Sequence, residues 1–185
     1  MPSRKLSAPA DPLGSAGADN STDPENVARQ IALRLLESQP RTRAELERAM
    51  ARRGVPADAA TAVLDRFTEV GLVDDEAFAT AWVTSRHNGR GLGRRALSQE
   101  LRKRGVDEDT VRDAVSAVSA DDERVAAVTL VERRLRTMTG LPRDTAIRRL
   151  VGMLARKGFS QSLAMSVVLE ALNHVDCDVK HAFSD

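Results

Sequence analysis

The chain contains three copies of one pattern. Each copy has a pair of basic residues, then a glycine and an apolar residue, and the glycines are Gly54, Gly105 and Gly158, 51 and 53 residues apart. Apolar residues recur at fixed distances before each glycine. Four positions before stand Met50, Leu101 and Leu154, and eight positions before stand Leu46, Leu97 and Leu150. Twenty-three positions before stand Ile31, Trp82 and Leu135, and twenty-seven positions before stand Val27, Phe78 and Val131. Agreement in so many columns indicates a tandem repeat of one structural unit.

Each copy is expected to form three helices. Asp23 and Pro24 suit the N-cap and first position of a helix, and Thr42 with Glu45 forms a capping box that opens the next one. The chain has four Phe, one Trp and no Tyr, and no convincing alternation of polarity, which disfavours strands. Three short helices bury little apolar surface alone, so we expect neighbouring units to share their cores. The sequence therefore predicts an all-α, elongated and curved array of three tandem three-helix repeats.

This interpretation divides the chain into five segments. The first residues are rich in Ser, Ala, Pro, Gly and Asp without periodicity, which is typical of a disordered leader. The predicted segments are a leader at 1–22, three-helix repeats at 23–73, 74–120 and 121–174, and a C-terminal tail at 175–185. In the third repeat, helices are expected at about 122–137, 143–157 and 161–173.

Positive charge is concentrated in the second repeat. Between positions 86 and 104 there are seven basic residues and one acid, Glu100, although the net charge of the whole chain is +1. The candidates for binding a negatively charged partner are these seven and the basic pair of the third copy: Arg86, Arg90, Arg94, Arg95, Arg102, Lys103, Arg104, Arg156 and Lys157. Such a local excess favours contact with DNA phosphates or with an acidic protein surface.

Part of this pattern has a simpler explanation. Basic residues in the last turn of a helix interact favourably with its macrodipole, by about 0.3–1 kcal/mol each, which accounts for the pairs before the glycines. Arg90, Arg94 and Arg95 are expected in a loop or at a helix start, where positive charge is unfavourable, so they favour an external partner. The glycines among them would let a partner approach the backbone closely. A solvated, mobile loop is the alternative.

The hydrophobic pattern of the second repeat predicts its core. The inward stripe of its first helix is expected to be Phe78, Ala81, Trp82 and Ser85. The residues assigned to structural roles are Phe78, Trp82, Leu97, Leu101 and Gly105, the last as a left-handed residue after a helix. Trp82 is interpreted as a core anchor rather than a base-stacking residue, because the chain lacks the aromatic platform of single-strand binders.

The sequence offers no catalytic or cofactor motif. It has no phosphate-binding GxxxxGK[ST] loop, and the glycines from Gly89 to Gly93 have the wrong spacing for a dinucleotide site. His174, Cys177 and His181 match no common zinc pattern, so no metal is expected. The single cysteine, the lack of a long apolar run and the lack of a signal peptide predict a cytoplasmic protein that does not enter a membrane.

Two runs of the second repeat resemble the RecX family, regulators of the RecA recombinase. They are DDEAFATAWVTSR from Asp74 to Arg86 and GRGLGRRALSQELRKRGV from Gly89 to Val106, and the resemblance extends over about residues 27–173. It implies an all-helical, non-enzymatic protein that lies in the groove of the RecA–DNA filament. It also implies inhibition of RecA's ATP hydrolysis, strand exchange and co-protease activity. The expected partners are the RecA filament and the phosphates of its single-stranded DNA, and the chain is expected to be a monomer.

Two other functions fit parts of the sequence. Residues 41–73 resemble a winged-helix transcriptional regulator, although a wing requires a β-hairpin where Asp74 and Asp75 favour a helix start. A helical-repeat scaffold with an unrelated partner is the second alternative. Sequence-specific footprinting distinguishes the first, and pull-down on RecA filaments distinguishes the second.

Overall fold

The chain forms nine α-helices and no strand within residues 23–138 and 140–182, the part that this computed structural model describes. The first three are α1 (Pro24–Ser38), α2 (Arg43–Ala51) and α3 (Ala57–Glu69). The next are α4 (Asp75–Arg90), α5 (Arg94–Arg104) and α6 (Glu108–Ser116). The last are α7 (Ala120–Leu135), α8 (Arg143–Arg156) and α9 (Gln161–Ala182). The predicted leader at 1–22 lies outside the described residues.

Local sequence signals begin most of these helices. Asp23 caps α1 through its side chain, with proline in the first turn, and Thr42 and Glu45 form the predicted capping box of α2. Asp74 caps α4 by accepting a hydrogen bond from the Ala77 N–H at 2.8 Å. The chain therefore continues as helix α4 where a winged helix would need its β-hairpin, so the structure does not support that alternative.

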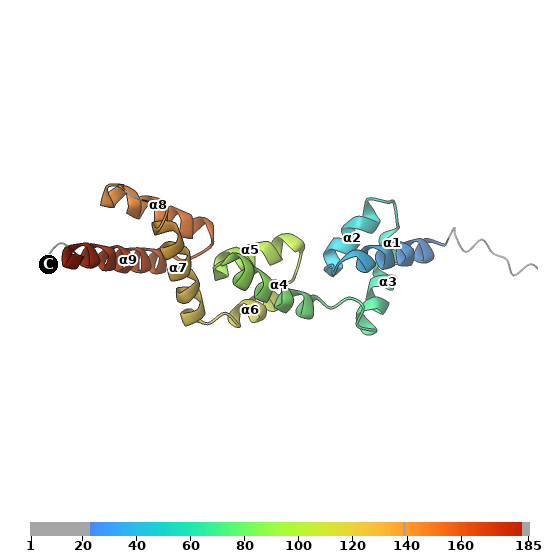
Figure 1. The fold of residues 1–185 in the computed structure, drawn as a ribbon. Helices are drawn as coiled ribbons and strands as arrows, with labels where there is room; N and C mark the ends of the chain where they lie inside the picture. Colours follow the sequence, from blue (N-terminus) through green and yellow to red (C-terminus); the bar gives the residue numbers. More distant parts are fainter. Residues whose placement is uncertain (1–22, 139, 183–185) are drawn as a thin grey trace, which may run out of the picture.

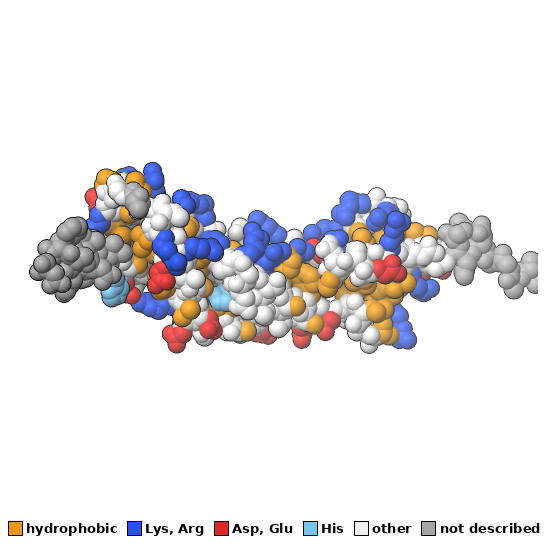
Figure 2. Space-filling view, in the orientation of Figure 1, with side chains coloured by type: hydrophobic (Ala, Val, Ile, Leu, Met, Phe, Trp, Pro, Cys, Tyr) orange, Lys and Arg blue, Asp and Glu red, His pale blue; other side chains and the backbone are white. Residues whose placement is uncertain are grey.

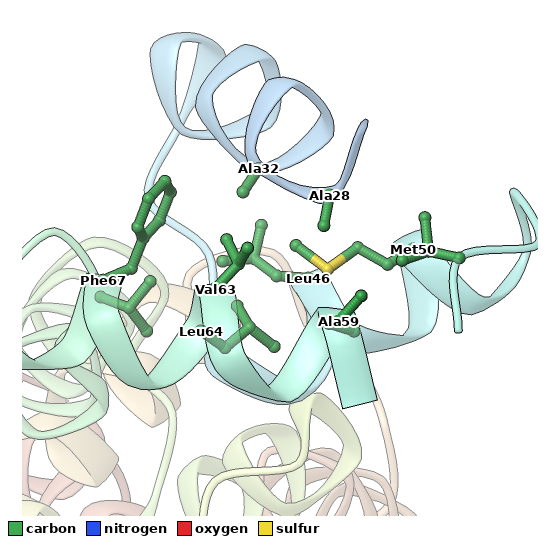
Figure 3. Packing of buried hydrophobic residues seen from close by; sticks show 11 residues of the cluster. Ala28, Ala32, Leu46, Met50, Ala59, Val63, Leu64 and Phe67 are labelled. Atoms are coloured by element: carbon green, nitrogen blue, oxygen red, sulfur yellow. The ribbon is translucent and has the colours of Figure 1, made fainter. Parts of the chain in front are cut away.

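Each group of three helices encloses its own hydrophobic cluster. In the first group, α1 contributes small residues, whereas α2 and α3 contribute larger ones, and Figure 3 shows them converging. The labelled residues are Ala28, Ala32, Leu46, Met50, Ala59, Val63, Leu64 and Phe67. The second and third clusters are drawn from α4–α6 and α7–α9 with their connections. The expectation that neighbouring units share a core is therefore wrong: the units meet through other contacts, described below.

The buried face of the first helix in each unit differs from the predicted one. In α1 and α4 the fully buried positions are Ala28 and Ala32, and Ala79 and Val83. Phe78 and Trp82 are only half-buried, and Ala81 and Ser85 are exposed, because the interior accepts small side chains where these helices pass closest. The predicted stripe is thus rotated by about one residue.

The third unit also departs from the repeat register. Its buried positions in α7 are Ala127, Leu130 and Val131. Ala127 and Val131 lie 31 and 27 residues before Gly158, whereas the equivalent residues in the first unit, Ala28 and Ala32, lie 26 and 22 before Gly54. The longer connection from α7 to α8, residues 136–142, accounts for this offset. Two columns are therefore wrong, the one that equated Leu135 with Ile31 and Trp82 and the one that equated Val131 with Val27 and Phe78, whereas the columns nearest the glycine hold.

The units follow one another along an elongated molecule (Figure 1). Helices α2, α5 and α8 lie along one edge, and the two ends of the described chain lie at opposite ends of the array. The edge is hollowed between the first and third units in Figure 2, so the array is curved as predicted. Among the described residues, no helix is both long and apolar enough to cross a membrane.

The last helix is longer than predicted. It runs to Ala182 rather than ending near residue 173, so the segment assigned to the tail continues the helix. Cys177 and His181 lie on it, but their side chains are outside the described residues, as are residues 183–185.

Candidate binding edge and its two glycine junctions

Basic side chains gather on the edge formed by the second helix of each unit. Figure 2 shows Lys and Arg mostly along this side of the molecule and Asp and Glu mostly along the opposite side. We call the surface of α2, α5 and α8 the basic edge. Folding therefore separates charges that alternate in blocks along the sequence, and a near-neutral chain acquires one positive side.

The N-terminal turn of α2 docks on the C-terminal end of α5. Thr42 is fully buried, and its hydroxyl donates to the Arg104 carbonyl at 2.8 Å. Arg48 donates to the same carbonyl at 3.0 Å. A β-carbon on Gly105, which has φ +87°, would lie 2.4 Å from the β-carbon of Ala44. Only glycine allows this approach, so Gly105 holds the first two units together as well as ending α5.

The N-terminal turn of α5 docks on the C-terminal end of α8 in the same manner. The Gly93 N–H donates to the Lys157 carbonyl at 2.8 Å, and the Arg95 N–H donates to the Gly158 carbonyl at 3.3 Å. A β-carbon on Gly158 would lie 2.3 Å from the backbone nitrogen of Ala96. The second helices therefore follow one another head to tail along the basic edge, with a glycine at each junction.

An aromatic and arginine cluster covers the first junction. Phe78 and Trp82 stack with ring centroids 5.7 Å apart, and the guanidinium groups of Arg86 and Arg104 lie 4.0 and 3.8 Å from the Trp82 ring centroid. The Trp82 indole N–H donates to Glu100 at 3.0 Å. Trp82 thus packs at the boundary of the second unit rather than at its centre.

Several of the nine candidate residues have structural partners. Arg104 pairs with Glu45 across the first junction at 2.5 Å, and Arg102 pairs with Glu108 at 2.5 Å. Arg94 donates from Nε to the Val118 carbonyl at 2.7 Å, and its backbone N–H donates to Glu123 at 2.9 Å. These contacts hold α5 against its neighbours, so a charge reversal at Arg94 would disturb packing.

Lys157 and Arg90 also meet within the chain. The Lys157 ammonium donates to the Arg90 carbonyl at 2.5 Å. Burial lowers the pKa of Lys157, and the charges of Arg133 and Arg90 lower it further. Arg90 lies in the last turn of α4 rather than in a loop, so the helix macrodipole favours its charge. The second junction therefore concentrates cations.

Five candidates are exposed on the surface, namely Arg90, Arg95, Arg102, Lys103 and Arg156. Arg95 and Arg156 line the same groove between α5 and α8, with a volume of about 480 Å³. Val151, Ala155 and Phe159 are among the apolar residues that line it. Among the described residues, neither Arg95 nor Arg156 pairs with a carboxylate, so this groove presents positive charge beside apolar surface.

Two of the three glycines between Arg86 and Arg94, Gly91 and Gly93, pack closely against the third unit. A β-carbon on Gly93 would lie 2.8 Å from the Gly158 backbone, and one on Gly91 would lie 3.2 Å from the Leu130 side chain. Their close approach is thus to the third unit, whereas the sequence suggested an external partner. At Gly89, the third of these glycines, a β-carbon would meet no heavy atom within 4 Å.

Sequence reasoning missed the residues that receive these arginines. Thr42 and Glu45 were identified only as a helix cap, yet both also bind the next unit. Glu123 was not singled out, yet its carboxylate accepts a hydrogen bond from the Arg94 backbone N–H. The sequence carried one signal of the contacts between units: the residue before each glycine is basic in all three copies, as Arg53, Arg104 and Lys157.

Comparison with known proteins identifies the units. Three family models match: RecX, first three-helix domain, at residues 28–67; second three-helix domain, at 74–115; and third three-helix domain, at 121–168. The chain is 53% identical over 175 residues to Regulatory protein RecX of Thermobifida fusca, covering 93% of this chain and 92% of that one. It is 52% identical over 159 residues to Regulatory protein RecX of Streptomyces coelicolor, covering 86% of this chain and 85% of that one.

Solved structures agree with the fold. The crystal structure of RecX from Lactobacillus salivarius superposes with a TM-score of 0.73 at 22% identity, covering 80% of this chain and 96% of that chain. A second crystal structure of regulatory protein RecX superposes with a TM-score of 0.70 at 23% identity, covering 78% of this chain and 71% of that chain. With three matched family models and close relatives over nearly its whole length, the chain belongs to the RecX family.

Proposed function

We propose that this chain lies in the groove of the RecA–DNA filament and inhibits RecA's ATP hydrolysis, strand exchange and co-protease activity. It does so by binding and has no catalysis of its own. The names of its relatives, which are regulatory proteins, support this role. In this proposal the protein acts in the cytoplasm as a monomer and needs no cofactor.

The observation that carries the proposal is the basic edge. Three helices of the same kind, one from each unit, share one hollowed side of an elongated molecule (Figures 1 and 2). A helical filament presents a repeating surface, and a repeated protein can bind several of its protomers at once. Linked weak contacts raise the overall affinity through effective concentration, so no single site has to be strong.

Arg95 and Arg156 are the residues proposed to contact the filament most directly. They flank one groove and are exposed, whereas Arg94, Arg104 and Lys157 are held by contacts within the chain. Single-stranded DNA phosphates and RecA carboxylates both carry the required charge. Contact with phosphates gives the steeper loss of affinity with salt, because binding releases condensed counterions.

The test is RecA ATPase on single-stranded DNA, titrated with this protein at two salt concentrations. Inhibition is expected at low salt and should weaken as salt rises. The double variant Arg95→Glu/Arg156→Glu is expected to inhibit much less. Its matched control is Arg66→Glu/Arg112→Glu, which changes the net charge equally at two exposed arginines of α3 and α6.

Two results would contradict the proposal. If the wild-type protein leaves RecA ATPase unchanged at every concentration, the function is wrong. If both double variants inhibit like the wild type, the function stands but Arg95 and Arg156 are not its contacts. Thermal unfolding of each variant shows whether the fold is retained.

A further inference from the structure

The two junctions between units differ in how their basic residue is neutralised. At the first junction, Arg104 at the end of α5 pairs with Glu45, an acid in the first turn of the docked helix α2. At the second junction, Lys157 follows α8, but the docked helix α5 has no acid in its first turn. The Lys157 ammonium instead donates to a neutral acceptor, the Arg90 carbonyl, at 2.5 Å. The charge of Lys157 therefore has no matching carboxylate on the turn that docks there.

Two arginines bring further positive charge to this junction. Arg90 lies in the last turn of α4 and Arg133 in the last turn of α7. Both side chains are exposed, and both line one cavity of about 530 Å³ between the second and third units. Burial lowers the pKa of Lys157, and the charges of Arg133 and Arg90 lower it further. Three cations from the ends of α4, α7 and α8 therefore lie close enough to repel one another.

Acidic residues of this region do not neutralise the three cations. Asp122 lines the same cavity, but it lies eleven residues before Arg133 on α7, which separates their backbones by roughly 16 Å along the helix. Glu100 comes within 3.9 Å of Arg90, but it is shared with a second arginine at 3.7 Å. Among the described residues, no carboxylate forms an ion pair with Arg133 or Lys157.

Helix ends explain why each of these charges is tolerated, but not why the three lie together. Each stands in the last turn or at the C-cap of its helix, where the macrodipole favours a cation. That interaction joins one residue to its own helix, whereas mutual repulsion opposes bringing three helix ends of this kind into one place. A group of like charges that the chain leaves unneutralised is suited to an external anion.

We propose that Arg90, Arg133 and Lys157 bind phosphates of the single-stranded DNA in the RecA filament. A nucleic-acid strand carries one negative charge per nucleotide on a continuous backbone, so neighbouring phosphates can neutralise three cations together. An acidic protein segment would have to bring several carboxylates, each on its own side chain, into one cavity. This inference rests on the proposed function, and it adds Arg133 and the second junction to the contacts of that function.

The rest of the cavity fits contact with the strand's backbone rather than recognition of its bases. Val125 and Leu130 are among its apolar residues, and no Phe or Trp side chain of the described chain lines it. His87 also lines it, with Nδ1 2.9 Å from the Leu92 carbonyl. Base stacking in single-strand binders uses aromatic faces, so binding here is expected to be independent of sequence.

A strand bound at this site would span the second junction. Arg90 belongs to the second unit, whereas Arg133 and Lys157 belong to the third, and neutralising them removes the repulsion between the two units. Hydrogen exchange of the Gly93 N–H, which donates to the Lys157 carbonyl across this junction, should therefore slow when an oligonucleotide binds. The matched control is the Arg43 N–H, which donates across the first junction at 2.9 Å and should exchange as before.

The main test measures binding of a labelled single-stranded oligonucleotide to the full-length protein without RecA. Arg133→Gln is compared with Arg134→Gln, which removes the same charge from an exposed neighbour on α7 that does not line the cavity. Loss of one phosphate contact should reduce the slope of log affinity against log salt by about 0.7. The defect of Arg133→Gln should then grow about fivefold for each tenfold fall in salt, whereas Arg134→Gln should keep the slope of the wild type.

Four results separate the site from the function. If the two variants bind alike, or if the free wild type does not bind the oligonucleotide, the site is wrong while RecA inhibition stands. Slower exchange at Arg43 but not at Gly93 would place the strand at the first junction and also overturn the inference. Equal binding of a poly-glutamate peptide, weakened equally by Arg133→Gln, would show that the ligand is protein carboxylate. A wild type that leaves RecA ATPase unchanged would refute the proposed function itself.

Discussion

The Arg104 guanidinium lies 2.5 Å from the Glu45 carboxylate of the preceding unit while it covers the ring of Trp82. The two side chains are 28% and 17% exposed, so solvent screens this ion pair less than one on the open surface. Two units with separate cores are therefore joined by charge, by an aromatic face and by backbone hydrogen bonds. Such a joint depends on individual residues, and each can be tested.

A double-mutant cycle on Arg104→Ala and Glu45→Ala measures this ion pair. The coupling energy is expected to be about 1–2 kcal/mol, because both groups are largely removed from water and share one contact. Chemical denaturation of the wild type, the two single variants and the double variant provides the four free energies. Additive effects would show that the pair contributes nothing to the joint.

Gly158→Ala should be far more damaging than Gly71→Ala. Both substitutions place a β-carbon at positive φ, which costs about 1–2 kcal/mol. At Gly158 the new atom would also lie 2.3 Å from the Ala96 backbone, and this overpacking should add about 1–3 kcal/mol or separate the second and third units. Unfolding free energies compare the two variants, and equal losses would contradict the close contact.

Neighbouring arginines at the start of α5 should respond differently to charge reversal. Arg94→Glu removes the hydrogen bond to the Val118 carbonyl and places a carboxylate near Glu123, so a loss of about 1–3 kcal/mol is expected. Arg95→Glu should leave stability within about 0.5 kcal/mol, because its side chain is exposed. Thermal unfolding distinguishes them, and equal stability of the two variants would show that the Arg94 contact is not significant.

Asp75 should make the first junction sensitive to pH. Burial raises its pKa, although the Arg43 N–H donates to its carboxylate at 2.9 Å and opposes the shift. The folded state then holds the proton more tightly than the unfolded state, so stability is greatest below the unfolded pKa and falls as pH rises through the raised value. Asp75→Asn keeps an acceptor for Arg43 and should stabilise the protein at neutral pH.

The gain from Asp75→Asn should disappear on acidification. Well below the ordinary aspartate pKa of about 3.9 the wild-type carboxyl is protonated in both states, so the two proteins should have nearly the same unfolding free energy. Denaturant titrations of both at neutral and acidic pH supply the comparison. A gain that persists unchanged at acidic pH would mean that ionisation of Asp75 is not its cause.

The sequence was sufficient for the fold because the repeat signals are local. The glycine, its basic pair and the apolar residues one and two turns earlier recur in every unit, and capping residues such as Asp23 and Thr42 mark helix starts. The extent to which each side chain is buried was harder to predict. Phe78 and Trp82 have the largest apolar side chains of α4, yet Ala79 and Val83 are buried, because close helix packing selects small residues rather than hydrophobic ones.

The binding residues could be predicted only in part. Their concentration in the second unit is visible as charge, but the most distant partners of Arg94, Arg104 and Lys157 are 29, 62 and 67 residues away in the sequence. Periodicity carries no information about contacts between units at such separations. The distinction between Arg104, which is held, and Arg95, which is exposed, therefore required the three-dimensional structure.

Separate cores change how this molecule can deform. A protein with one continuous interior resists bending throughout its length, because every layer of packed side chains must shift together. Here, rotation at Gly105 or Gly158 would disturb a few hydrogen bonds and one or two ion pairs while leaving each bundle of three helices intact. We therefore expect bending of the array to be concentrated at these two junctions, with the three bundles moving as separate bodies.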